Sequence, residues 1–461
     1  MKLNFFGGAQ SVTGANYLLE ATDKNGKEVR IIVDCGLVQG DSKEEEKNYE
    51  KFQYDTKTVD AVFITHAHID HTGRLPFLYR SGFRNKIYST KPTKDLTEQL
   101  LVDSQGLLEK DAIKKGIKPL YTAEDVEGVM RLFEGVDYHQ KIEIDPFTFE
   151  YFDAGHILGS GFIKVTGPAK DGGMKTIVFS GDLGNKASPL VRDTEKLEGA
   201  NVIVMEALYG DKFHEEPEKR MERLEDAIED SVHDGGVLMI PAFSMERTQE
   251  LLYEIDQLIV NRRIPRVPIF VDSPLAIKLI SVYKKYSDDP LYFDEAAMKM
   301  FESGEQVFNF PGLTLTLTTN ESKEINDVPP PKVIIAGSGM SEGGRMIHHE
   351  YRYLSDPKST LLFISYQASH SLGRRILNGE RMVKIFGEDI LVRCKIKSIG
   401  GYSAHADQAK LLEWLSPIRE TVEKVYLVQS EIESAQVFAV KARDVLAIDT
   451  EIPEGNESIE I

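Results

Sequence analysis

Histidine and aspartate side chains crowd together near residue 66 in a pattern that suits metal binding. The segment His66-Ala67-His68-Ile69-Asp70-His71 directly follows an apolar run, Val59 to Ile64. Because a strand anchors the loop that follows it, these potential ligands can converge on one small volume. Imidazole and carboxylate ligands without a nearby thiol are typical of catalytic Zn²⁺, Mn²⁺ or Fe sites. The ligands are too many for one ion, so we expect two.

Three further candidate residues stand where other predicted strands end. His156 and Asp182 each follow a glycine, and Glu206 follows the apolar run Val202 to Met205. Taken alone, His156 is equally consistent with an ordinary hydrogen-bonded histidine, and Asp182 with a residue that caps a turn. The carboxyl ends of strands build binding sites in α/β sheets, so all three are candidates for one site.

Two segments in the second half of the chain could bind an anion. Gly337-Ser338-Gly339 follows the apolar run Val333 to Ile335, and its backbone N–H groups could hold a phosphate, although a tight turn explains the glycines equally well. The stretch Arg374 to Lys397 holds seven basic and three acidic residues. A solvated basic face is the usual meaning, but in an acidic chain this basic stretch could also bind a nucleic acid backbone.

The pattern of residues 403–415 predicts a helix with Ser403 as its N-cap, which would place His405 in the first turn. Short runs rich in valine and isoleucine predict buried strands along the whole chain, with helices between some of them. We therefore predict an α/β fold. Further strands are expected at residues 177–179, 237–240, 269–271, 361–364 and 425–428, and further helices at 95–108 and 244–259.

Composition narrows the class of protein. The chain has 461 residues, which favours more than one domain, and a net charge of −19. An anionic partner must therefore meet a local basic site or bound cations. Two distant cysteines, Cys35 and Cys394, give no disulfide framework. No apolar run is long enough to span a membrane, so we expect a cytoplasmic protein without a membrane partner.

The metal motif resembles that of the metallo-β-lactamase superfamily, and later motifs resemble its β-CASP ribonucleases. This resemblance covers essentially the whole chain. It implies a metallo-β-lactamase αββα sandwich, residues 1–209 and 394–461, with an inserted α/β β-CASP domain, residues 210–393. The later motifs include Met205-Glu206-Ala207-Leu208-Tyr209-Gly210, Asp272-Ser273-Pro274-Leu275-Ala276, Gly337-Ser338-Gly339-Met340, Leu372-Gly373-Arg374-Arg375 and Gly401-Tyr402-Ser403-Ala404-His405-Ala406-Asp407.

The resemblance also implies roles for the residues and a substrate. It predicts a metal-dependent ribonuclease that cuts single-stranded RNA with a metal-bound hydroxide, using two zinc ions. The implied metal ligands are His66, His68 and His156 for the first ion, Asp70 and His71 for the second, and Asp182 for both. The implied catalytic residues are Asp70, Glu206 and His405, with His405 as the general acid. The implied substrate-binding residues are Gly337, Ser338, Gly339, Met340, Arg374, Arg375 and Ser403.

The chain departs from the β-CASP pattern at one important position. Gln429, in Leu427-Val428-Gln429-Ser430-Glu431, stands where a histidine ligand of the second ion is expected. An amide oxygen is a weaker and harder ligand than imidazole, so we predict a weakly occupied second site or one that prefers Mn²⁺ or Mg²⁺. The rival hypothesis is an RNA-binding scaffold with weakened catalysis. The sequence leaves the oligomeric state open, a homodimer included.

Overall fold

The computed structural model describes residues 1–40, 42–185, 188–214, 219–302, 308–368 and 371–461. Contacts within the chain divide it into two compact units. Unit 1 comprises Met1–Lys186, Arg192–Phe213 and His405–Ile461, and unit 2 comprises Ala187–Val191 and His214–Ala404. The domain limits expected at 209/210 and 393/394 stay a prediction.

Unit 1 contains two seven-stranded sheets. The first has the order β22-β1-β2-β3-β4-β5-β6 and the second the order β21-β20-β11-β10-β9-β8-β7. The strands of the first sheet are β1 (Lys2–Gly7), β2 (Asn16–Thr22), β3 (Glu28–Val33), β4 (Ala61–Phe63), β5 (Lys86–Thr90), β6 (Phe133–Val136) and β22 (Ser458–Glu460). Those of the second are β7 (Ile142–Ile144), β8 (Phe147–Asp153), β9 (Gly161–Pro168), β10 (Met174–Phe179), β11 (Val202–Glu206), β20 (Lys424–Val428) and β21 (Thr450–Glu451).

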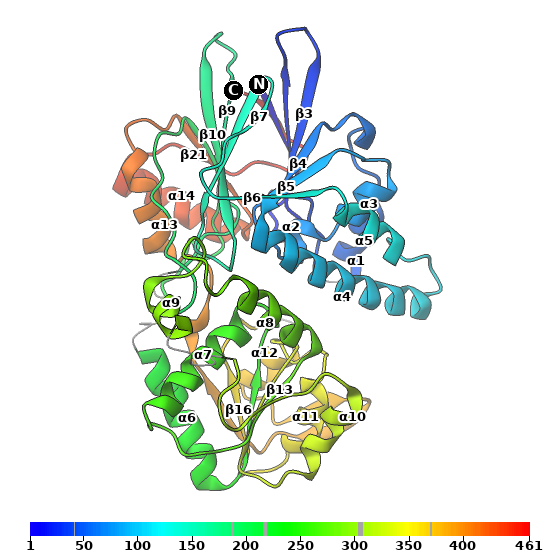
Figure 1. The fold of residues 1–461 in the computed structure, drawn as a ribbon, viewed down its shortest axis with the longest axis vertical. Coiled ribbons are helices and arrows are strands. Elements are labelled where there is room, and N and C mark those ends of the chain that lie inside the picture. The colour runs from blue at the N-terminus through cyan, green and yellow to red at the C-terminus, as the bar shows by residue number, and fades with distance from the viewer. Residues whose placement is uncertain (41, 186–187, 215–218, 303–307, 369–370) are drawn as a thin grey trace. The chain divides into compact units, whose positions relative to one another are not determined.

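The two sheets pack face to face through aromatic side chains. Phe63 of β4 stacks on Phe149 of β8 with ring centroids 3.8 Å apart, and Tyr17 of β2 lies 5.9 Å from Phe179 of β10. Helices cover the two outer faces (Figure 1). On the first sheet these are α3 (Leu75–Arg80), α4 (Lys91–Lys115) and α5 (Ala123–Met130), and on the second α13 (Gln408–Leu415) and α14 (Ile432–Leu446). The predicted αββα sandwich is confirmed.

Unit 2 is built on a six-stranded parallel sheet with the order β14-β13-β15-β12-β16-β19. The strands are β12 (Val237–Pro241), β13 (Ile269–Asp272), β14 (Leu313–Leu315), β15 (Lys332–Ala336), β16 (Thr360–Phe363) and β19 (Lys395–Ser398), and β17 (Met382–Ile385) and β18 (Glu388–Leu391) form a separate hairpin. Its helices are α6 (Arg220–Asp234), α7 (Arg247–Val260), α8 (Pro274–Tyr286), α9 (Glu295–Glu302), α10 (Thr319–Glu324), α11 (Met346–Tyr353) and α12 (Leu372–Leu377). The predicted α/β class is therefore confirmed here too.

The apolar runs noted in the sequence all contain strands, but two predicted helices begin later than expected. The helix predicted from residue 244 begins at Arg247, and the one predicted from residue 403 begins five residues late. Residues 403–407 are not helical, and α13 starts at Gln408 with Asp407 as its N-cap. The Asp407 carboxylate accepts a hydrogen bond from the Lys410 N–H at 3.0 Å. The prediction of Ser403 as N-cap was therefore wrong, because the β-bridge of His405 with Gly184 keeps this segment extended and the helix is capped by Asp407. Among the described helices, none has an apolar stretch long enough to cross a membrane.

Candidate metal centre and catalytic site

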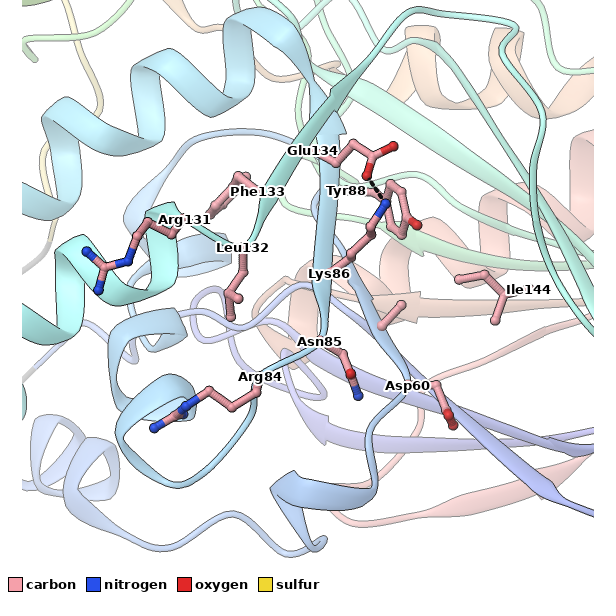
Figure 2. A pocket seen from close by; sticks show the side chains of 11 residues that line it. Asp60, Arg84, Asn85, Lys86, Tyr88, Arg131, Leu132, Phe133, Glu134 and Ile144 are labelled. Carbon is pink, nitrogen blue, oxygen red and sulfur yellow. Dashed lines mark hydrogen bonds and ion pairs between the residues drawn. The ribbon is translucent and has the colours of Figure 1, made fainter.

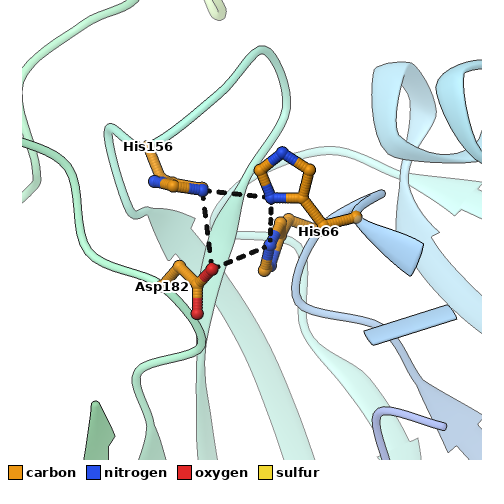
Figure 3. A group of neighbouring side chains, drawn as sticks. His66, His156 and Asp182 are labelled. Atoms are coloured by element: carbon orange, nitrogen blue, oxygen red, sulfur yellow. Dashed lines mark hydrogen bonds and ion pairs between the residues drawn. The ribbon is translucent and has the colours of Figure 1, made fainter. Parts of the chain in front are cut away.

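Four side chains of unit 1 bring their ligand atoms together at one point. Nδ1 of His68 lies 3.0 Å from Nε2 of His66 and 3.2 Å from Nε2 of His156. The Asp182 Oδ2 atom lies 3.3 Å from His66 Nε2 and 3.5 Å from His156 Nε2. Figure 3 shows His66, His156 and Asp182 facing one another. Each of the four residues offers one ligand atom, a ring nitrogen or a carboxylate oxygen, and these atoms all lie within 4.8 Å of one another, as in a metal-binding cluster.

The fold explains this convergence. His66 and His68 follow β4, His156 follows β8 and Asp182 follows β10. Strands β8 and β10 are both antiparallel to β9, so they run in the same direction and end at the same edge of the second sheet. The sheet packing brings the end of β4 to that edge, so residues far apart in the sequence meet there.

The ring nitrogens fit a divalent ion better than they fit one another. A neutral imidazole has one N–H group. The Nδ1 atom of His68 faces two other ring nitrogens, and a single N–H there cannot make good hydrogen bonds to both. Burial, followed by the neighbouring histidines and His405, lowers the pKa of His68 and His156 well below the usual value. Both rings are therefore neutral, with lone pairs available to a metal ion. We conclude that the donor set is chemically suited to a cation.

His71 lies in a second group beside the cluster. Its Nε2 atom is 3.3 Å from Asp182 Oδ1 and 3.8 Å from Asp70 Oδ2. Its Nδ1 atom contacts Asp34 Oδ2 at 2.8 Å. Burial opposes the charged ring, but the three carboxylates outweigh it and raise the pKa of His71 well above its usual value. The site is thus strongly anionic around His71.

Asp34 is a further residue of this site that was not predicted from the sequence. Its carboxylate accepts hydrogen bonds from the Thr65 N–H and Thr65 hydroxyl, both at 2.8 Å, in addition to its contact with His71. It therefore fixes both the start of the histidine loop and the orientation of one ring. Its place directly after the apolar end of β3 is the one sequence feature that points to it, and ordinary turn aspartates share that feature.

Gln429 lies inside this second group. Its Nε2 atom is 2.7 Å from His71 Nε2 and donates to Asp182 Oδ1 at 3.2 Å. The Tyr17 hydroxyl is 3.5 Å from its Oε1 atom. The amide group therefore occupies space that faces two of the expected ligands of the second ion.

Glu206 and His405 form a third group next to Asp182. His405 Nδ1 lies 3.3 Å from Glu206 Oε2 and 3.9 Å from Asp182 Oδ2. The other oxygen of Glu206 accepts from the Leu183 N–H at 2.6 Å, which fixes the carboxylate. Burial alone would lower the pKa of His405, but Glu206 first, then Asp182 and Asp70, outweigh burial and raise it. A quarter of the His405 side chain, 24%, stays exposed, so a substrate can reach it.

The predicted anion-binding residues lie in unit 2, and some of them are brought together. The Gln367 side-chain amide donates to the Gly339 carbonyl at 2.9 Å, and Arg374 Nε donates to the Gln367 carbonyl at 2.8 Å. The Gly373 N–H donates to the Met340 carbonyl at 3.1 Å. The loop after β15 and the start of α12 thus form one hydrogen-bonded region.

Other members of the predicted anion-binding set are engaged within unit 2. The Ser338 N–H donates to the Gly343 carbonyl at 3.1 Å, so it closes its own turn. Arg375 pairs with Glu380 at 2.5 Å, and Lys397 pairs with Asp230 at 2.5 Å. Lys395 pairs with Asp234. The basic stretch therefore carries less free positive charge than its composition suggests.

A hollow of about 550 Å³ lies elsewhere in unit 1, and Figure 2 shows the side chains that line it. It is lined by residues at the start of β4 and β5, and the ion pair of Lys86 with Glu134 lies beside it. The histidine loop leaves β4 from its opposite end, after Phe63. The hollow is thus separate from the candidate site.

Comparison with known proteins agrees with this geometry. Residues 25–182 match the metallo-beta-lactamase superfamily domain, residues 248–376 the Beta-Casp domain, and residues 389–453 the Zn-dependent metallo-hydrolase RNA specificity domain. A solved structure of a protein of unknown function from Enterococcus faecalis V583 shares the fold, with a TM-score of 0.56 at 12% identity over 100% of this chain and 99% of that one.

Two named relatives match over nearly the whole chain. Ribonuclease TTHA0252 of Thermus thermophilus is 35% identical over 96% of this chain and 97% of its own length. Transcription termination factor FttA of Thermococcus kodakarensis is 30% identical over 100% of this chain and 71% of its own length. Together with the three domain matches, these similarities show that the chain belongs to the β-CASP family of the metallo-β-lactamase superfamily.

Proposed function

We propose that this protein is a metal-dependent ribonuclease that hydrolyses phosphodiester bonds of single-stranded RNA. The observation that carries the proposal is the convergence of His66, His68, His156 and Asp182 beside the His405–Glu206 pair. The family membership and the ribonuclease named among the relatives support RNA as the substrate. A buried site at strand ends favours single strands, since a rigid duplex reaches it poorly.

The first ion would be held by His66, His68, His156 and Asp182, and we propose zinc because of the imidazole-rich set. A divalent ion bound there would lower the pKa of a water molecule and offset the negative charge that grows on the phosphate. Asp34 would keep His71 oriented, and Leu183 would keep Glu206 in place. These buried contacts pre-organise the site before substrate arrives.

His405 is well placed to act as the general acid. We assign Nδ1 to the contact with Glu206 and Nε2–H to proton donation. Its raised pKa favours the protonated ring, which is the form that a general acid needs. As the phosphorus–oxygen bond breaks, the Nε2 proton passes to the departing ribose oxygen, and water supplies the hydroxyl that joins phosphorus. The proton that this water loses passes to solvent, from which His405 is reprotonated. The products are a phosphomonoester and a free ribose hydroxyl.

The test is cleavage of a labelled single-stranded RNA by the purified protein with Zn²⁺ or Mn²⁺. We expect turnover that His68→Ala abolishes and that His233→Ala, a histidine of α6 in unit 2, leaves intact. A matched duplex should be cut more slowly. Tight RNA binding without cleavage would instead support the rival hypothesis of a scaffold, and binding of neither RNA nor metal would contradict both.

The second ion is expected to bind weakly because of Gln429. An ion held by His71 at the usual distance of about 2.0–2.1 Å would have to displace the amide nitrogen that lies 2.7 Å away. After gel filtration, elemental analysis should therefore find about one tightly bound ion per chain. Gln429→His should raise the count towards two. Two tightly held ions in the unmodified protein would refute this expectation.

We also propose that the protein works in the cytoplasm. Cys35 and Cys394 are both free and buried, which suits a reducing compartment such as the cytoplasm. We keep a homodimer as the expected alternative to a monomer, and sedimentation velocity at several concentrations distinguishes the two.

A further inference from the structure

The segment that leads to His405 is held in unit 2 by a buried polar cluster. Residues Gly400–Tyr402 form a short 3₁₀ turn. Arg220 Nη1 donates to the Gly401 carbonyl at 3.1 Å, and its guanidinium lies 4.6 Å from the centre of the Tyr402 ring. Arg220 also pairs with Glu254 at 2.5 Å, and the Tyr402 hydroxyl donates to the same carboxylate. Arg220, Glu254 and Tyr402 are 6%, 2% and 0% exposed.

His405 itself is held in unit 1. It forms a β-bridge with Gly184, and the next residue, Ala406, donates its N–H to the Leu183 carbonyl at 2.8 Å. Its ring contacts Glu206, as described above. The first anchor of this segment thus lies wholly in unit 2 and the second wholly in unit 1.

Only Ser403 and Ala404 separate the two anchors. A fully extended chain spans roughly 3.3–3.6 Å per residue, so the Cα atoms of Tyr402 and His405 can be at most about 11 Å apart. A tether this short limits how far the Tyr402 turn and His405 can separate. The turn is thus the last anchor in unit 2 before the general acid.

The chemistry of the first anchor suits a positioning role. Taking a charged pair out of water costs free energy, and an apolar replacement is often as stable or more stable. The buried pair does, however, fix the geometry of the turn, because Arg220 donates to Glu254 and to Gly401 at the same time and stacks on Tyr402. Such a fork fixes direction as well as distance.

We propose that Arg220, Glu254 and Tyr402 are positioning residues that fix the unit 2 end of the segment carrying His405 and so hold its ring for proton donation. This inference rests on the proposed ribonuclease function. It assigns no contact with substrate to the three residues. Their effect on the reaction passes entirely through the tether of residues 403 and 404.

The experiment compares two leaving groups at the same bond. The bond that the unmodified protein cuts is first mapped, and the RNA is then made with sulfur in place of the bridging oxygen that departs. A thiolate leaves without a proton, so its departure needs no general acid. The variants are Tyr402→Phe and Glu254→Gln. The matched control is Tyr283→Phe, since Tyr283 is also a buried tyrosine of unit 2 that donates to a buried glutamate, Glu246.

We expect kcat on the oxygen substrate to fall roughly 10- to 100-fold in both variants, because small misplacements of a catalytic group have effects of this size. KM should stay unchanged, and the sulfur substrate should be cut at nearly the normal rate. Tyr283→Phe should leave the ratio of the two rates unchanged. Equal losses on both substrates would indicate a merely structural role and overturn the proposal, as would no loss on either.

Thermal unfolding of the variants and the rates of His405→Ala separate a failure of folding, of the His405 role and of the positioning role. If Glu254→Gln unfolds, as thermal unfolding would show, Tyr402→Phe decides alone, because it removes a single oxygen atom. His405→Ala must itself show the selective loss on the oxygen substrate. If it does not, the proposed role of His405 fails, whereas a selective loss in His405→Ala without one in Tyr402→Phe overturns only the positioning role.

Discussion

Glu350 of α11 shows how one buried carboxyl can make stability depend on pH. The Ser341 hydroxyl donates to it, and among the described residues its Oε2 atom has no hydrogen-bond partner. Burial raises its pKa to about 8 from an ordinary 4.5, an effect that the bond from Ser341 only reduces. Because the folded pKa is the higher one, folding favours the protonated form. Stability contributed by Glu350 is therefore present below pH 4.5 and lost as the pH rises through 8.

We predict that Glu350→Gln stabilises the protein at pH 8 but not at pH 4.5, since the amide stays neutral at both. Thermal unfolding at the two pH values measures this, and we expect a gain of a few degrees at the higher one. The exposed Glu420→Gln should give no such difference. A Glu350→Gln variant with the same effect at both pH values would contradict the prediction.

Single residues also show what the sequence could and could not reveal. His66, His68 and Asp182 could be predicted because their types and order are distinctive. Asp34 could not be singled out, because an aspartate after a strand is most often a turn residue and only the packing of β3 beside β4 brings it to His71. Likewise, no pattern in the sequence showed that Arg375, Lys395 and Lys397 are paired with acids.

At the scale of elements, the start of α13 determines how His405 is presented. The helix begins after Asp407, so His405 lies in an extended segment and not in a helical turn. The sequence pattern predicted Ser403 as the cap, but the β-bridge of His405 with Gly184 excludes the longer helix. The structure of the loop is thus set by a tertiary contact.

We predict that Asp407→Ala lowers the free energy of unfolding of unit 1 by about 1 kcal/mol through loss of the cap. Asp407→Asn retains a side-chain oxygen for the Lys410 N–H and should cost much less. Chemical denaturation of the two variants measures the difference. Equal destabilisation by both substitutions would show that the cap is not the cause.

At the scale of the whole molecule, the candidate ligands all belong to unit 1, so metal binding should stabilise the two units unequally. Removing the ion leaves buried carboxylates and crowded imidazoles without their cation. An ion present at 100 to 1,000 times its Kd stabilises the folded form by about 3–4 kcal/mol. We predict that a chelator makes unit 1 unfold at a lower temperature and leaves unit 2 unchanged.

Hydrogen exchange measured by mass spectrometry during heating resolves the two units. In His68→Ala, which lacks a ligand, the chelator should have little further effect. An equal loss of protection in β12 and β15 of unit 2 would contradict the prediction, because neither strand contributes a residue to the metal cluster.

Unit 2 interrupts unit 1 along the chain, so the last segment of unit 1, His405–Ile461, is synthesised after unit 2. Residues 214–404 form most of unit 2 and leave the ribosome before the last segment of unit 1. Until then, β11 has no β20 to pair with, and Glu206 has no His405 beside it. A nascent chain therefore carries His66, His68, His156 and Asp182 without the residue we assign as proton donor. On our proposal, general-acid catalysis at this site cannot begin before residue 405 has been synthesised.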